Sequence, residues 1–157
     1  MRKLFILLGL AAVLLCGSAS AQNRKFGLGI MLGEPTGLSA KLWTGKNTAI
    51  DGALAWSFGS IGAFGYQGAL YVHADYLFHN FNLIKVEKGR LPVYYGIGAS
   101  VVLASSVGVG IRIPIGLEYV FADAPFDIFL EIVPMLAVVS GTSFGVNAGL
   151  GARYFFK

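Results

Sequence analysis

The chain has 157 residues, with 12 basic and 8 acidic side chains and a formal net charge of +4. Only 13% of the residues are charged, about half the roughly 25% of a typical soluble domain. This composition excludes the basic footprint of a nucleic-acid-binding protein and indicates that much of the surface does not face water. The single cysteine, Cys16, excludes a disulfide framework.

Residues 1–21 have the features of a cleaved secretory signal peptide. Arg2 and Lys3 form a basic start, residues 4–16 form an apolar run, and residues 19–21 (ASA) form a small-residue cleavage site. The apolar run is too short for a comfortable membrane-spanning helix. We therefore expect an exported protein.

Cleavage after Ala21 removes 21 of the 157 residues and leaves 136, enough for one domain over residues 22–157. The mature chain then carries ten basic and eight acidic residues and no cysteine. Lipid attachment at Cys16 is an alternative, although Leu15 stands where such sites usually carry a small residue.

Three windows of the mature chain contain no Asp, Glu, Lys or Arg and are long enough for transmembrane helices: Gly52–Ala74, Leu91–Ile111 and Ile132–Ala152. Turn-like clusters interrupt them, however, and their apolar residues recur at every second position. A period of two indicates strands, because a helix repeats every 3.6 residues.

Alternation of apolar and other residues continues along the whole mature chain. The alternating segments span residues 25–32, 38–43, 50–58, 70–78, 93–101, 107–121, 126–133 and 144–156. In each segment the charged residues share one face. In segment 107–121, for example, every odd position is apolar, while Arg112 and Glu118 stand at even positions.

Strands in hydrocarbon must satisfy all backbone hydrogen bonds internally, so a spanning sheet has to close. Eight is the smallest common strand number for such barrels. We therefore predict an all-β fold, an eight-stranded antiparallel up-and-down transmembrane β-barrel. An Arg112 facing lipid at the midplane would cost about 2–4 kcal/mol, so the charged face should line the lumen. Pro114 cannot donate to the ladder and predicts a bulge or kink.

A soluble sandwich or lipocalin-like barrel is an alternative, but its water-facing surface would then consist mostly of Gly, Ala, Tyr and Phe. Aromatic residues gather near the segment ends, as expected for the two aromatic girdles of a membrane barrel.

An even strand number places both termini on the periplasmic side. Connections 44–47 and 122–125 would be periplasmic turns, whereas the connections near 33–37, 58–65, 103–108 and 140–143 would face outward. The longest and most charged connection, 79–90, falls on the periplasmic side, contrary to the usual pattern of short periplasmic turns. Either the orientation fails there or the flanking strands extend as a small periplasmic hairpin.

The chain resembles the small eight-stranded outer-membrane barrels of Gram-negative bacteria, the OmpA-, OmpX- and OmpW-like group. The sharpest feature is "FGVNAGLGARYFF" (144–156), which looks like the C-terminal strand signal read by the barrel-assembly machinery, with Tyr154 and Phe156 as its aromatic residues. Here Lys157 follows the aromatic residue, a departure from the pattern. The segment "GLGIMLGEPTGLSAK" (27–41) resembles the start of uncharacterised bacterial small-barrel proteins. The resemblance implies an outer-membrane location, lipids as neighbours and no particular activity.

The inward face collects most of the charged residues of the strands. These are Lys41, Asp51, His73, Asp75, Arg112, Glu118, Asp127, Glu131 and Arg153. Opposite charges in a narrow interior are expected to pair, because an unpaired buried charge costs several kcal/mol. Trp43, Tyr71, Tyr94 and Phe129 could fill the room that inward glycines leave. We therefore expect a largely plugged lumen, a structural or membrane-integrity role, and no cofactor or metal.

Two other functions stay open. The barrel could be a narrow pore, or it could hold a hydrophobic molecule against its glycine-lined wall. Alternatively, His73 and Asp75, two positions apart on one face, could join the inward Ser57 in an acyl hydrolase or transferase acting on outer-membrane lipid. No nucleophile motif supports that enzyme. We expect a monomer that contacts lipids and, during biogenesis, the barrel-assembly machinery, and that binds no nucleic acid.

Overall fold

The computed structural model describes residues 24–58, 68–139 and 142–156. The expected signal peptide, residues 1–21, lies outside these residues. The described part contains nine antiparallel strands. They are β1 (Phe26–Glu34), β2 (Thr36–Trp43), β3 (Thr48–Ser57), β4 (Ala69–Asn80), β5 (Val93–Leu103), β6 (Val107–Arg112), β7 (Ile115–Val120), β8 (Phe126–Ala137) and β9 (Ser143–Phe156).

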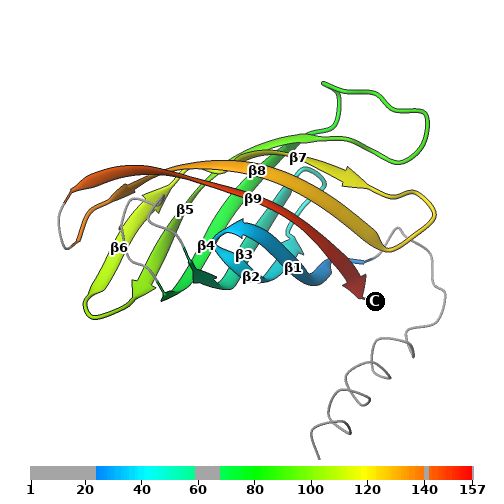
Figure 1. Ribbon diagram of the computed structural model, residues 1–157. Coiled ribbons are helices and arrows are strands. Elements are labelled where there is room, and N and C mark those ends of the chain that lie inside the picture. Colours follow the sequence, from blue (N-terminus) through cyan, green and yellow to red (C-terminus); the bar gives the residue numbers. More distant parts are fainter. Residues whose placement is uncertain (1–23, 59–67, 140–141, 157) are drawn as a thin grey trace, which may run out of the picture.

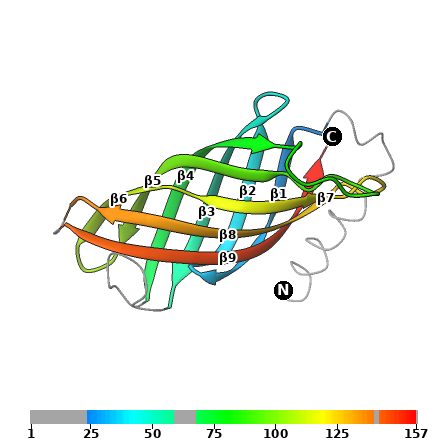
Figure 2. The same cartoon turned by 90° about the horizontal axis from the view of Figure 1, so that it is seen from above.

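The sheet closes on itself, because the first and last strands pair with each other (Figures 1 and 2). Phe26 of β1 lies opposite Leu42 of β2 on one side and opposite Phe156 of β9 on the other. Strands β6 and β7 follow one another in a single position between β5 and β8. The ring therefore has eight strand positions, which confirms the predicted barrel.

Pro114 explains why nine strands fill eight positions. The sequence predicts one segment over 107–121 with a local kink, and the structure interrupts it at Ile113 and Pro114. Proline has no N–H to give to the ladder. The neighbouring backbone still pairs, since Ile113 N donates to Pro134 O at 2.9 Å and Gly96 N donates to Pro114 O at 2.9 Å. The barrel wall is thus continuous through the break.

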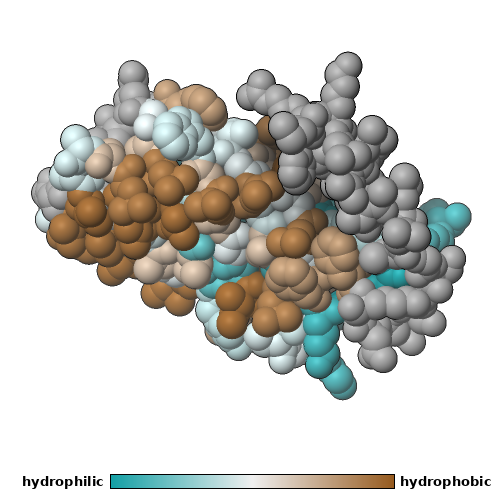
Figure 3. Space-filling view, turned by 90° about the horizontal axis from the view of Figure 1, so that it is seen from below, coloured by the Kyte–Doolittle hydropathy of each residue, from teal (hydrophilic) through white to brown (hydrophobic). Residues whose placement is uncertain are grey.

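The predicted faces are correct along the ring. Arg112 is 1% exposed and Glu118 is fully buried, whereas Ile113 between them is 49% exposed. The same alternation runs through β4, β8 and β9. On the face shown in Figure 3, the outward hydrophobic side chains join into broad patches. The inside of the barrel is the protein core, and the outside is apolar.

The three uncharged windows do not form helices in the described residues, where they are strands and connections. Within 24–58, 68–139 and 142–156, no helix is long and apolar enough to cross a membrane.

The connections are grouped at the two ends of the barrel as the chain order requires. The start of β1, the end of β9, the 44–47 turn, the 81–92 loop and the 121–125 turn share one end, which we call the terminal end. Strand β4 continues to Asn80, which pairs with Val93 of β5. The β4–β5 ladder ends at this pair, and residues 81–92 add no further strand, so any hairpin extension of these two strands reaches no further than Asn80 and Val93. The 81–92 loop turns back onto β7, where the Arg90 and Val120 backbones pair.

Candidate functional site

The barrel lumen holds the charged side chains that the alternation assigned to it. All eight are at most 9% exposed. They are Lys41, Asp51, Asp75, Arg112, Glu118, Asp127, Glu131 and Arg153, and each takes part in at least one ion pair.

At the terminal end of the lumen, Glu118 of β7 binds Lys41 of β2 and His79 of β4. The Lys41 ammonium pairs with Glu118 Oε2 and lies 2.8 Å from His79 Nε2, which is itself 3.0 Å from Glu118 Oε2. The Lys41 ammonium also lies 4.4 Å from the centre of the Trp43 ring. Because all three polar groups are buried, a charge-assisted contact of this kind is stronger than one in water.

Arg153 of β9 connects this group to the middle of the lumen. Its Nε is 3.1 Å from both Asp127 oxygens, and its Nη1 donates to Asp51 Oδ2. Its Nη2 lies 3.6 Å from Glu118 Oε1, and the guanidinium stacks over Phe129 with 4.1 Å to the ring centre. A planar guanidinium with five donors suits such a multiple contact better than an ammonium.

Arg112 of β6 has a similar role further along the barrel axis. Its Nε lies 2.9 Å from Asp75 Oδ1, its Nη2 3.6 Å from Glu131 Oε1, and its Nη1 donates to the Tyr71 hydroxyl at 3.1 Å. Tyr94 donates to Glu131 Oε2 at 3.0 Å. The carboxylates and arginines therefore form a network that crosses the lumen.

His73 lies between two carboxylates. Its Nε2 is 3.7 Å from Asp75 Oδ2 and 3.9 Å from Asp51 Oδ1. Both distances exceed a hydrogen bond, and the buried Nδ1 has no hydrogen-bond partner. These three side chains form the one group of metal-ligating residues found within the described part of the chain.

Aromatic rings fill the space beside the inward glycines. A Cβ on Gly116 would lie 2.4 Å from Tyr94 Cζ, and a Cβ on Gly151 would lie 2.4 Å from Phe129 Cζ. Tyr94 and Phe129 pack in one buried cluster with Met31, Ala53 and Leu77. Side chains of the barrel itself thus occupy the space beside Gly116 and Gly151.

The structure does not bring Ser57 to His73. Ser57 lies on β3 opposite Ala69 of β4, four positions along the strand from His73, which is about 13 Å at the strand rise. The Ser57 hydroxyl donates to Glu34. Only His73 and Asp75 of the three candidates are neighbours.

His79 is the functional residue that the sequence prediction missed. The prediction ended the strand at Phe78 and placed His79 in the following connection. The structure continues β4 to Asn80, and His79 is 4% exposed. Positions 71, 73, 75, 77 and 79 are all buried, so extension of the same period by one step would have found it.

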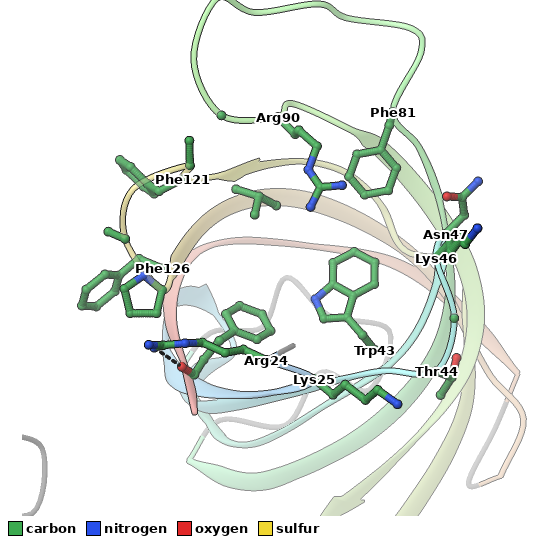
Figure 4. A pocket seen from close by; sticks show the side chains of 17 residues that line it. Arg24, Lys25, Trp43, Thr44, Lys46, Asn47, Phe81, Arg90, Phe121 and Phe126 are labelled. Atoms are coloured by element: carbon green, nitrogen blue, oxygen red, sulfur yellow. Dashed lines mark hydrogen bonds between the residues drawn. The ribbon is translucent and has the colours of Figure 1, made fainter. Parts of the chain in front are cut away.

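A cavity of about 890 Å³ opens at the terminal end of the barrel (Figure 4). Four cationic side chains line it, Arg24, Lys25, Lys46 and Arg90, and its lining residues include no carboxylate. The remaining wall is largely aromatic, with Trp43, Phe81, Phe121, Phe126 and Phe155. In Figure 4 the Trp43 indole points into the opening beside Phe81 and Arg90; the Trp43 and Phe81 ring centres lie 6.1 Å apart, and the Arg90 guanidinium lies 4.9 Å from the Phe81 ring centre.

The residues of the expected assembly signal belong to an aromatic chain at this same end. The Tyr154 ring lies 5.0 Å from Phe156 and 5.1 Å from Phe126, and Phe156 lies 6.4 Å from Phe26. Their role in assembly stays a prediction.

Comparisons with known proteins extend these observations. No curated protein matches the sequence. The fold is similar to the crystal structure of the N-terminal β-barrel domain of Pseudomonas aeruginosa OprF, with a TM-score of 0.57 and 15% identity over 85% of this chain and 98% of that one. The match supports a small β-barrel of this type, but not membership of the OmpA-, OmpX- or OmpW-like group. A family model described as "Protein of unknown function (DUF3996)" matches residues 18–156, and the chain therefore belongs to that family.

Proposed function

We propose that the protein is a monomeric β-barrel of the bacterial outer membrane with a closed lumen and a structural role in the membrane. The observation that carries the proposal is the buried ion-pair network, in which every charged group of the lumen meets an opposite charge. An eight-stranded interior is just wide enough for side chains, and here the side chains of Arg112, Arg153 and Tyr94 occupy it.

The membrane location rests on the outer face. Outward side chains such as Leu32, Ile97, Leu130 and Ile132 are each more than half exposed. Soluble monomers rarely expose contiguous apolar patches beyond a few hundred Å², so hydrocarbon is the solvent that this surface suits. The similarity to the OprF barrel domain supports the same location.

Aromatic pairs at the terminal end support a membrane interface there. Besides the aromatic residues that contact Phe156, three further pairs of rings are in contact. The distance between ring centres is 5.1 Å for Tyr76 and Phe78, 5.8 Å for Phe78 and Tyr95, and 4.8 Å for Tyr119 and Phe121. Such rings prefer the headgroup zone. With both chain ends on this side, we assign it to the periplasm, and we expect Tyr154 and Phe156 to be read by the barrel-assembly machinery.

Planar-bilayer recording tests the closed lumen. The refolded wild-type barrel should give no conductance steps under conditions in which a porin control conducts. The double variant R112A/R153A, which empties the middle of the lumen, should conduct if it refolds. Reproducible steps from the wild-type protein that scale with salt concentration would overturn the proposal, and the barrel would then be a narrow pore.

A second candidate function is binding of an anionic amphiphile, such as a fatty acid, at the terminal mouth. The cavity combines four cations with five aromatic rings, and its volume lies within the roughly 300–1,000 Å³ of ligand pockets. A carboxylate would meet the basic side chains, and an acyl chain would pack against the rings.

Quenching of Trp43 tests this second function. The chain has two tryptophans, so a W56F background in lipid nanodiscs isolates the Trp43 signal. A brominated fatty acid should quench it saturably, a brominated alcohol of the same length should quench it far less, and R90Q should weaken the binding. Equal quenching by acid and alcohol would indicate simple partitioning and contradict specific binding.

A further inference from the structure

Two aspartates face each other inside the barrel on neighbouring strands. Asp51 of β3 and Asp75 of β4 are direct partners in the register. Like charges directly opposite each other on one face of a sheet destabilise the pair, and here both residues are at most 9% exposed. The pair therefore requires positive charge close to both carboxylates.

Each aspartate has one carboxylate oxygen in an ion pair with an arginine. Its second oxygen lies outside that ion pair. Arg153 binds Asp51 through Oδ2, and Arg112 lies 2.9 Å from Asp75 Oδ1. The remaining oxygens, Asp51 Oδ1 and Asp75 Oδ2, both face His73 Nε2, at 3.9 and 3.7 Å. Outer partners that hold a carboxylate through its second oxygen orient ligands in this way in metal sites.

The other contacts of the His73 ring include an edge-to-face contact with Tyr71, with 5.8 Å between the ring centres. His73 is 4% exposed, and its Nδ1 has no hydrogen-bond partner. The ring thus presents Nε2 to the two carboxylate oxygens, and one ligand atom from each of the three residues lies within 4.8 Å of the other two. In a tetrahedral zinc site with bonds of about 2.0–2.1 Å, ligand atoms lie about 3.4 Å apart. The two contacts of His73 Nε2, at 3.7 and 3.9 Å, would have to shorten by about 0.3–0.5 Å to reach this spacing.

The charge balance of the lumen is compatible with a divalent ion. Among the described residues, the buried ionisable groups include five carboxylates and three cations, so with all five carboxylates ionised and both histidines neutral the lumen has an excess of two negative charges. An uncompensated buried charge costs several kcal/mol. One dication between Asp51, His73 and Asp75 would remove the excess.

We propose that Asp51, His73 and Asp75 form a buried site for one divalent transition-metal ion, with Zn²⁺ as the ion that this ligand set suits. One imidazole nitrogen and two carboxylate oxygens are ligands that zinc accepts, and three protein ligands leave a fourth position for water or another oxygen. Gly98 makes room for the site, because a Cβ there would lie 1.8 Å from Asp75 Oδ1. The site lies beyond the proposed closed-lumen function and does not depend on it.

Refolding with zinc tests the site. Untagged barrel is refolded from urea into detergent with a small excess of Zn²⁺, passed through gel filtration, and analysed by mass spectrometry for metal per protein. We expect one Zn²⁺ per barrel and a higher unfolding midpoint than after refolding with a chelator. A wild-type barrel that folds without retaining stoichiometric zinc would overturn the proposal.

The two histidines of the chain provide a matched pair of variants. H73Q removes a metal ligand and should lower the zinc affinity by more than roughly 10–100-fold, the loss typical when a residue that only hydrogen-bonds to a ligand is removed. H79Q removes a buried histidine that contacts Lys41 and Glu118 and should retain the ion. Equal zinc retention by H73Q and wild type would also refute the site.

X-ray absorption at the zinc edge decides the question if H73Q does not refold. In H79Q protein, His73 is the sole remaining imidazole, so an imidazole scattering signal must come from it. We expect one imidazole nitrogen with oxygen ligands at about 2.0–2.2 Å. Oxygen scattering alone would mean that zinc binds elsewhere and would reject the site.

Discussion

Replacement of Glu118 by glutamine removes the carboxylate that compensates Lys41. Both side chains are fully buried, and among the described residues Glu118 is the single carboxylate within ion-pair distance of Lys41. After the change, Lys41 keeps His79 Nε2 at 2.8 Å as a polar neighbour. Arg153 is less affected, because it retains Asp127 and Asp51.

Removal of one partner from a buried ion pair costs about 3–5 kcal/mol, because the other charge is left without compensation. A loss of that size lowers the folding equilibrium constant by roughly 150- to 5,000-fold. Replacement of both partners by groups without charge is often neutral or better. We therefore expect the double variant K41M/E118Q to be more stable than E118Q alone.

Urea titration of the barrel in lipid vesicles, followed by tryptophan fluorescence, measures these differences. Mobility of unboiled samples on gels gives an independent folded fraction. The reasoning fails if E118Q costs less than about 1 kcal/mol, the value of an exposed pair, or if the effects of K41M and E118Q simply add in the double variant.

Three further outcomes test the fold. Leu130→Arg, at a 54%-exposed outward position of β8, should cost about 2–4 kcal/mol near the bilayer midplane, whereas Leu83→Arg in the 81–92 loop should cost little by the same urea titration. Gly151→Ala should destabilise the barrel by about 1–3 kcal/mol through overpacking, because the new Cβ would meet the Phe129 ring. In the double variant G151A/F129L the smaller leucine side chain should restore part of the lost stability. Finally, unboiled wild-type barrel should migrate differently from boiled protein and show β-type circular dichroism, and identical migration would count against a closed barrel.

Much of the fold could be predicted from the sequence because the side-chain period of a strand is two. A charge at Arg112 and an apolar residue at Ile113 already assign opposite faces, whatever the rest of the chain does. The same rule placed the eight lumen charges and the aromatic residues that fill the space beside the glycines. Chain order then sufficed to place the 44–47 and 122–125 turns at one end.

Which charges meet across the lumen was decided by the tertiary structure. Arg153 reaches Asp51 although β1 and β2 separate their strands in the ring, and Asp51 meets Asp75 through the β3–β4 register. Such pairs depend on strand stagger and barrel closure, which alternation along one strand does not contain. The tertiary structure also decides where strands end. His79 enters the lumen because β4 continues to Asn80, and the length of β4 depends on its pairing with β5. Alternation assigns a side chain to a face, whereas closure of the ring determines its partner.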